Sequence, residues 1–436
     1  MKIPSTVRLI SKTIVITAVF TIGLFEPSSG QNKTLVKAQE ITRAAMDAYR
    51  RHDYRSALNS FLEARVLRPD HPTLRYNIAA TSSLTGDKRN ALQELTTLSS
   101  MGLIYHPERD SDFVAVWGDR EFLEIISRFD RNAKPTGRSE LAFRLAEKGL
   151  IAEGIALNPN SGALYVSSVR KRKIVQVDRN GRETDFSAST DGLFAAMGMK
   201  VDRDRGVLWV CSSAVPQMNG STGDVNGRAG LFKYDLANGR LVRKYLSDTL
   251  RPHIFGDLVL SKSGEPYVTD SRSPAIYRIR SRSDQLELFL ESDSFASLQG
   301  IAFSDDERTL YVADYSRGVF TVDMSSQKVS ILDPPENCTL LGIDGLYQHG
   351  RSLVAIQNGV NPNRVLRVQL DKEGKKIDSW VTLESNHVDF DEPTLGFVEG
   401  NNFFYVANSQ WSKVDRKGGL PPDSTLAHHV ILKIAL

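Results

Sequence analysis

The 436-residue sequence predicts a multidomain protein: an N-terminal α-helical repeat region followed by an all-β six-bladed propeller. Two internal repeats carry this prediction. The first is a helical pattern of small and large apolar residues that occurs twice between positions 38 and 100. The second is an apolar-apolar-polar-apolar run that recurs six times between 174 and 434, at a spacing of roughly 42 to 46 residues. An apolar content of 41% is sufficient for two hydrophobic cores.

Residues 1–30 have the features of a secretory signal peptide. Positive residues precede an almost wholly apolar run, Ile14 to Phe25, and small residues follow as far as Gly30, after which we expect cleavage. This run is much shorter than a membrane span, which needs about 20 residues. An uncleaved anchor is the alternative. We therefore expect an exported protein, periplasmic or secreted, with no stable membrane span after cleavage.

The overall charge and the cysteine content exclude several classes of function. The 55 Lys and Arg residues nearly balance the 52 Asp and Glu residues, so the sequence lacks the concentrated basic face that nucleic-acid binding requires. Cys211 and Cys338 fall in different predicted blades, and we expect both to be free thiols. The sequence contains no phosphate-binding loop, nucleophile elbow or paired-cysteine metal motif.

The helical repeat has a recognisable spacing. The first copy contains Tyr54, Ala57, Phe61, Ala64 and Pro69, and the second copy aligns Ala91 with Ala57 and Leu95 with Phe61. Small residues at such positions let two helices approach closely, and large ones fill the space between them. The pattern resembles the tetratricopeptide family over residues 38–129, with residues 112–129 as a closing helix. The resemblance implies a groove for a protein or peptide partner; a structural or dimerising role is the alternative.

A linker is expected at 130–140, and the propeller at 141–436. Each of the six recurring runs is preceded by another strand, and two insertions, 216–228 and 412–425, lengthen the second and sixth blades. A blade cannot bury both of its faces alone, so the ring must close. We expect Leu141 to Ala146 to supply the outer strand of the last blade, beside Val430 to Leu436, because an unpaired sheet edge is avoided in natural proteins.

Three inner strands begin with a polar residue before glycine: Glu153-Gly154, Gln299-Gly300 and Asp344-Gly345. This order resembles the regucalcin/gluconolactonase-like family of six-bladed propellers, to which strictosidine synthase-like propellers are related. In that family the metal-dependent lactonases hold a divalent ion at the mouth of the central channel. The ion is bound by a glutamate, by asparagines and by an aspartate at the starts of inner strands, and calcium suits such oxygen ligands best.

Carried over to this sequence, the resemblance makes Glu153, Gln299 and Asp344 the expected metal ligands. Gln299 stands where the family has asparagine and is longer by one methylene, and Gly256 stands where the third blade would have another asparagine. The resemblance also implies that Asp257 or Asp344 acts as the general base. Purely structural roles are the alternative for each: a carboxylate held by strand N–H groups, a tight turn, or a hydrogen bond across the channel.

Two functions follow from these features. The first is an exported propeller that binds a small-molecule ligand in its channel, or a protein, with the helical repeats as an interaction module. The alternative is a divalent-metal-dependent hydrolase of a sugar lactone or small ester. The helical module and the altered ligand set favour the binding role. We expect Asp270 and Asp314 to cap turns at strand ends and His253 to lie in a loop rather than in a catalytic site.

Overall fold

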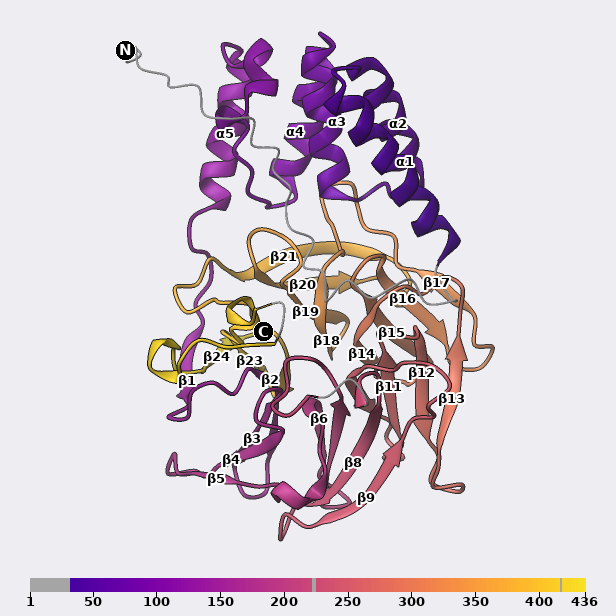
Figure 1. Ribbon diagram of the computed structural model, residues 1–436, viewed down its shortest axis with the longest axis vertical. Helices are drawn as coiled ribbons and strands as arrows, with labels where there is room; N and C mark the ends of the chain where they lie inside the picture. Colours follow the sequence, from indigo (N-terminus) through magenta and orange to yellow (C-terminus); the bar gives the residue numbers. More distant parts are fainter. Residues whose placement is uncertain (1–31, 222–224, 416–417) are drawn as a thin grey trace. The chain divides into compact units, whose positions relative to one another are not determined.

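The computed structural model describes residues 32–221, 225–415 and 418–436. These residues form two compact units, one within 34–133 and the other within 134–436 (Figure 1). The predicted signal peptide lies outside the described residues. Among the helices that are described, none has both the length and the hydropathy of a membrane span.

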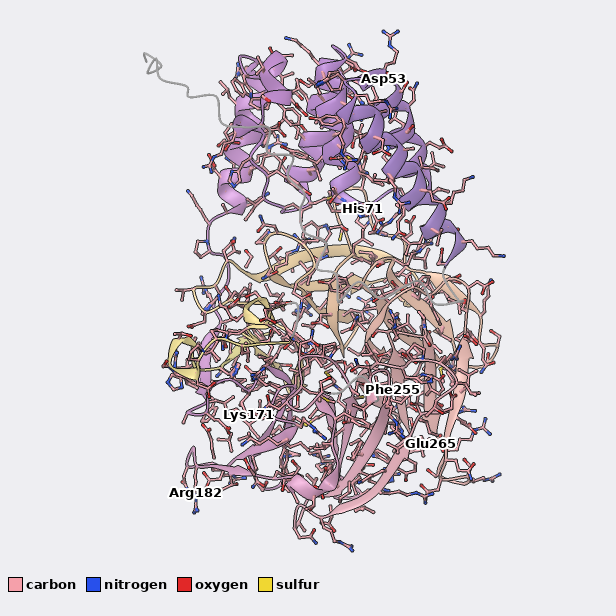
Figure 2. The ribbon with its side chains drawn as sticks, viewed as in Figure 1. Asp53, His71, Lys171, Arg182, Phe255 and Glu265 are labelled. Atoms are coloured by element: carbon pink, nitrogen blue, oxygen red, sulfur yellow. The ribbon has the colours of Figure 1, made fainter. Side chains whose placement is uncertain are left out.

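The first unit is helical. It contains α1 (Lys33–Arg50), α2 (Tyr54–Leu67), α3 (Pro72–Leu84), α4 (Lys88–Ser100) and α5 (Arg120–Asn132), with the short 3₁₀ helices η1 (Pro107–Arg109) and η2 (Ser111–Val116) before α5. Asp53, labelled in Figure 2, accepts a hydrogen bond from the N–H of Ser56 at the start of α2, and Asp87 accepts one from the N–H of Asn90 at the start of α4. The structure therefore confirms an N-terminal helical region, in which α2 and α4 have the same type of N-cap. The assignment of this region to the tetratricopeptide family stays a prediction.

The second unit consists of six antiparallel four-stranded sheets, which confirms the predicted propeller (Figure 1). The first blade contains β2 (Ala152–Asn158), β3 (Ala163–Ser168), β4 (Lys173–Val177) and β5 (Glu183–Asp185). The second contains β6 (Ala195–Asp202), β7 (Val207–Ser213), β8 (Ala229–Asp235) and β9 (Leu241–Leu246). The third contains β10 (Phe255–Leu260), β11 (Pro266–Asp270), β12 (Ala275–Ile279) and β13 (Leu286–Glu291). The next two are β14 (Leu298–Phe303), β15 (Thr309–Asp314), β16 (Gly318–Asp323), β17 (Val329–Ile331); and β18 (Ile343–His349), β19 (Ser352–Gln357), β20 (Arg364–Leu370), β21 (Ile377–Ser385).

The sixth blade closes the ring with both ends of the propeller sequence. It contains β22 (Gly396–Glu399), β23 (Asn402–Val406) and β24 (Val430–Ala435), and β1 (Glu140–Arg144) pairs with β24 as its outer strand. The register aligns Glu140 with Lys433 and Arg144 with Val430. The predicted closure is confirmed. It joins the two ends of the domain through a hydrogen-bonded ladder and leaves β24 paired on both sides.

The inner strands follow one another around the propeller axis, in the order β2, β6, β10, β14, β18 and β22. Five of them have an irregular register near their first residues, at the pairs Ala152/Ile155, Ala196/Met199, Phe255/Leu258, Leu298/Ile301 and Ile343/Gly345. Such bulges redirect side chains and are common beside functional sites. The candidate ligands and bases singled out in the sequence all lie within these bulges.

Side chains at the ends of second strands hold the loops that lead into inner strands. The Asp314 carboxylate accepts hydrogen bonds from the N–H groups of Ala296 (2.6 Å) and Ser297 (3.0 Å). Asp270 does the same for the N–H of Ile254 (3.0 Å) in the preceding blade. Both aspartates are fully buried. Their predicted role as caps is confirmed, and it fixes where each inner strand begins.

Candidate functional site

Four carboxyl groups from different blades gather at the starts of the inner strands. Glu153 (β2), Asp257 (β10) and Asp344 (β18) lie at the bulges, and Glu392 precedes β22. Burial, and then the charges of Asp344, Glu392 and Asp257, raise the pKa of Glu153 well above its usual range. Residues from the first, third, fifth and sixth blades can influence one another in this way only near the propeller axis. These four residues are called the acidic cluster below.

The other members of the acidic cluster respond similarly. Burial raises the pKa of Asp344 to about 6, with the charge of Asp257 adding to the effect and a hydrogen bond from Asn358 opposing it. Burial and the charges of Asp344 and Asp391 raise the pKa of Glu392 to about 7. A group of carboxyl groups whose ionisation is this unfavourable would be stabilised by a bound cation.

Two oxygens of the acidic cluster are buried without a hydrogen-bond partner among the described residues: Asp257 Oδ2 and Glu392 Oε2. Most buried polar atoms in folded proteins have a partner, so such exceptions require an explanation. Both atoms are acceptors in the ionised state. What they lack is a positively charged or hydrogen-bond-donating ligand.

Asn358, which follows β19, holds Asp344 in place. Its Nδ2 donates hydrogen bonds to Asp344 Oδ2 (2.8 Å) and to the Pro393 carbonyl (3.0 Å), and its Oδ1 accepts one from the Tyr315 hydroxyl (3.0 Å). This chain of contacts joins the fourth, fifth and sixth blades beside one predicted ligand. Sequence reasoning missed Asn358 and Tyr315, because they come from loops rather than from inner strands.

Trp411, which immediately precedes the predicted insertion of the sixth blade, holds Glu153. Its indole N–H donates a hydrogen bond to Glu153 Oε2 (2.7 Å). The neighbouring Gln410 is fixed to Ala427, donating to its carbonyl (3.1 Å) and accepting from its N–H (3.0 Å). Trp411 also packs against an apolar cluster that includes Met218, from the insertion of the second blade. The segments at both insertions therefore contribute to the surroundings of Glu153.

Asp257 has a different environment. Its Oδ1 accepts a hydrogen bond from the Leu258 N–H (2.8 Å) and lies 3.5 Å from the Lys200 ammonium. The ammonium also lies 5.0 Å from the centre of the Tyr347 ring. Asp257 is thus paired with a cation that belongs to the protein, which makes it less suited than Asp344 to act as a general base. Its assignment as a base stays a prediction.

The two departures from the family pattern lie next to each other. Gln299 Oε1 is 3.5 Å from the position that a Cβ of Gly256 would occupy. The longer side chain of Gln299 therefore places an amide oxygen beside the position that lacks its asparagine. Among the described residues, no three His, Cys, Asp or Glu side chains are grouped closely enough to hold a metal. Carboxylate and amide oxygens are the ligand types that a hard cation such as Ca²⁺ prefers. The assignment of Glu153, Gln299 and Asp344 as its ligands stays a prediction.

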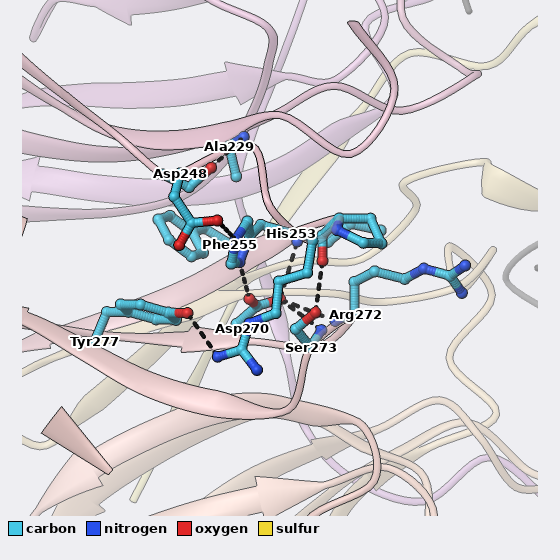
Figure 3. A network of polar contacts seen from close by, with 12 residues as sticks. Ala229, Asp248, His253, Phe255, Asp270, Arg272, Ser273 and Tyr277 are labelled. Atoms are coloured by element: carbon cyan, nitrogen blue, oxygen red, sulfur yellow. Dashed lines mark hydrogen bonds and ion pairs between the residues drawn. The ribbon is translucent and has the colours of Figure 1, made fainter. Parts of the chain in front are cut away.

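His253, which precedes β10, belongs to a polar network with Asp248 and Asp270 (Figure 3). It is fully buried, its Nδ1 is 2.6 Å from Asp270 Oδ2, and its Nε2 is 3.4 Å from Asp248 Oδ1. The rings of Phe255 and Tyr277 meet it edge-on. His253 lies in a loop, as predicted. Its burial and its contact with Asp270 were not predicted from the sequence.

Fold and site together define a six-bladed propeller with an acidic cluster at one end of its inner strands. Residues 151–382, more than half of the chain, match the family described as the SMP-30/Gluconolactonase/LRE-like region. The chain belongs to this family. A comparison with curated proteins finds no match.

Solved structures similar to this chain include three bacterial proteins. Regucalcin from Agrobacterium tumefaciens, a calcium-binding protein, is 16% identical, with a TM-score of 0.47 over 67% of this chain and 93% of that one. A gluconolactonase from Xanthomonas campestris is 16% identical, with a TM-score of 0.45 over 68% and 93%. The PQQ-bound aldose sugar dehydrogenase from Streptomyces coelicolor is 13% identical, with a TM-score of 0.46 over 69% and 99%.

Proposed function

We propose that the propeller binds a divalent cation, calcium in the first place, at the acidic cluster and hydrolyses a sugar lactone or small ester there. The observation that carries the proposal is the acidic cluster itself, in which burial and the charges of Asp344, Glu392 and Asp257 raise the pKa of Glu153. Among the described residues, the cluster also contains two buried oxygens without a hydrogen-bond partner, Asp257 Oδ2 and Glu392 Oε2. Membership of the SMP-30/Gluconolactonase/LRE-like family supports the choice of substrate class.

Each residue of the site has a role in this proposal. Glu153, Asp344 and the Gln299 amide oxygen would hold the cation, which would polarise the carbonyl of a bound lactone. Trp411 and Asn358 orient the two carboxylates through the hydrogen bonds described above. Glu392, whose pKa is raised to about 7, is suited to accept a proton from water at neutral pH.

The proposal is tested on purified protein that begins at Gln31, the residue after the predicted signal peptide. We expect micromolar binding of Ca²⁺ or Mn²⁺ by calorimetry, because a chelating set of carboxylates reaches this range. We also expect hydrolysis of D-glucono-1,5-lactone or a related lactone, which a chelator abolishes and Ca²⁺ restores. Cation binding without turnover of any lactone or ester would leave ligand binding as the function. Absence of cation binding would overturn the proposal.

A second candidate function, binding of a peptide partner by the helical unit, is favoured by exposed apolar side chains. Val66 on α2 is 80% exposed, Leu123 on α5 59% and Trp117 41%, so that each of these apolar side chains is available for contact with a partner. We expect the full chain to retain peptides from a random array, and Val66→Ser with Leu123→Ser to reduce retention. An array that retains no peptide, or retention that is unchanged by the substitutions, would contradict this role.

Export is part of both proposals. The signal-like features of residues 1–30 support it, and mass spectrometry of the protein from its native host is the check. A mature chain that begins at Gln31 agrees with export, and an intact Met1 in the soluble fraction would contradict it.

A further inference from the structure

Lys200 reaches from one side of the propeller ring to the other. It lies on β6 of the second blade, and its side chain is 20% exposed. Its ammonium contacts Asp257 of the third blade and the ring of Tyr347 of the fifth blade, at 3.5 Å and 5.0 Å. In a six-bladed ring the second and fifth blades are opposite each other. The Lys200 side chain therefore extends across the axis next to the acidic cluster.

Glycines make room for both partners of Lys200. A Cβ on Gly198 would lie 2.6 Å from Asp257 Oδ1, and a Cβ on Gly345 would lie 2.8 Å from the Tyr347 hydroxyl oxygen. That hydroxyl also accepts a hydrogen bond from the Gly396 N–H (2.6 Å), which fixes the ring. Because real Cβ atoms do not approach other atoms so closely, larger residues at these glycines would displace the groups that surround the ammonium. The position of the charge is thus specified by several blades.

The charge of Lys200 matters because of its neighbours. Of the charged groups that interact with Asp257, two are carboxyl groups of the acidic cluster, Glu153 and Asp344, and one is the Lys200 ammonium, 3.5 Å from Asp257 Oδ1. The ammonium lowers the energy of the ionised cluster when no ligand is present. It repels any cation that binds to the cluster, and this repulsion is weakly screened because the group is largely buried.

We infer that Lys200 is a built-in counter-charge, which lowers the affinity of the acidic cluster for cations in proportion to the charge of the cation. The inference rests on the proposed function, in which the cluster binds a cation. It makes Lys200 a specificity-determining residue that favours divalent over trivalent ions. It also explains why a cluster of four carboxyl groups need not hold two divalent ions.

The test is calorimetric titration of wild type and Lys200→Met with CaCl₂ and LaCl₃. Methionine retains most of the length of the side chain and removes the charge. Because Coulomb energy scales with the charge of the ion, we expect affinity to rise about tenfold for Ca²⁺ and about thirtyfold for La³⁺. The logarithms of the affinity increases for Ca²⁺ and La³⁺ would then be in the same ratio as the charges of the two ions. A merely structural effect would not produce this dependence on ion charge.

Two variants serve as controls. Lys200→Arg keeps the charge, and we expect affinities within about threefold of wild type. Lys233→Met removes another lysine that lies over an aromatic ring, 5.1 Å from the centre of Trp209, but on the third strand of its blade. We expect it to leave both affinities unchanged. Circular dichroism of each variant checks that it folds.

The outcomes separate this inference from the proposed function. If wild type binds Ca²⁺ and Lys200→Met binds it equally or more weakly, the inference is wrong and the proposed cation site stands. If only Lys200→Met binds cations, Lys200 is confirmed as the counter-charge and the proposed function of the natural protein is wrong. If neither protein binds a cation, both are overturned.

Discussion

Glu153→Gln and Asp344→Asn are each expected to weaken Ca²⁺ binding by at least about a hundredfold, because each removes a full negative charge from a buried set of oxygen ligands. Each change keeps the size of the side chain. Glutamine at 153 can still accept the hydrogen bond of the Trp411 indole through its carbonyl oxygen. The loss of affinity is therefore assigned to charge rather than to packing. Hydrolysis of lactones is expected to fall with cation binding.

The same two substitutions are expected to stabilise the cation-free protein. Burial, together with the charges of neighbouring carboxyl groups, raises the pKa of both Glu153 and Asp344, so that keeping them ionised at neutral pH opposes folding. An amide removes this cost. We therefore expect a higher thermal midpoint in the presence of a chelator and a smaller increase on adding Ca²⁺. Such opposite effects on stability and binding are typical of functional sites.

Glu399→Gln and Asp378→Asn are matched controls, because both residues are exposed on strands of the propeller. They should leave Ca²⁺ affinity and the thermal midpoint within error of wild type. If Glu153→Gln and Asp344→Asn also bind Ca²⁺ like wild type, the cation does not bind at the acidic cluster. If they destabilise the protein as core substitutions do, the carboxylates have the structural role that was the alternative.

His253→Gln is expected to lower the free energy of unfolding by about 3–5 kcal/mol at pH 6, because breaking a buried ion pair leaves the other charge without its partner. Asp270 would keep its backbone hydrogen bonds, including that from Ile254, but lose the imidazolium at 2.6 Å. Urea unfolding of the two proteins measures the difference. The exposed His106, in the helical unit, gives the control substitution His106→Gln, which should have little effect.

This loss of stability should depend on pH in a definite direction. Burial lowers the pKa of His253, but hydrogen bonding and the charge of Asp270, supported by Asp248, outweigh it and raise the pKa above 6.5. The other titratable groups here include Tyr277, whose ring meets that of His253, Arg251, which donates to the Tyr277 hydroxyl, and Arg272, whose charge acts on Asp270. A raised histidine pKa gives stability that is complete below pH 6.5 and is lost as pH rises through the folded value.

The difference between wild type and His253→Gln should therefore be largest near pH 6 and decrease towards pH 9. Because both proteins contain the acidic cluster, its contribution to the pH dependence cancels in the difference between their free energies of unfolding. A difference that is constant over this range would mean that His253 is neutral in the folded protein. A difference that grows with pH would contradict the assigned ion pair.

Repetition explains why the propeller could be predicted from the sequence. Each recurring set of strands corresponds to one blade, and a blade is stable only when it packs against its neighbours. Because unpaired strand edges are avoided, the first strand is expected to pair with the last, as β1 does with β24. The helical unit was predictable for the same reason, since Asp53 and Asp87 cap equivalent helices in the two copies of the repeat. What the repeats could not predict is the content of the loops, where no periodic constraint acts.

The site was predictable only in part. Glu153, Gln299 and Asp344 were indicated by the resemblance to a family, because they lie on inner strands whose positions the fold determines. Trp411, at the start of a short 3₁₀ helix, and Asn358, in a loop, contact two of these residues, and Trp411 is far from Glu153 in the sequence. One signal was available for Trp411, which immediately precedes the insertion 412–425. Lys200 is not part of any sequence motif. Its proposed role became visible only in the structure, where a residue of the second blade contacts Tyr347 of the opposite, fifth blade.

The most direct test of the proposed cation site is anomalous X-ray scattering from crystals of the mature protein soaked in MnCl₂. We predict one strong anomalous peak among the oxygens of Glu153, Gln299 and Asp344, at the distances that Mn²⁺ takes to oxygen, and its displacement by excess CaCl₂. A peak elsewhere in the propeller, or no peak at concentrations that saturate binding, would contradict the account.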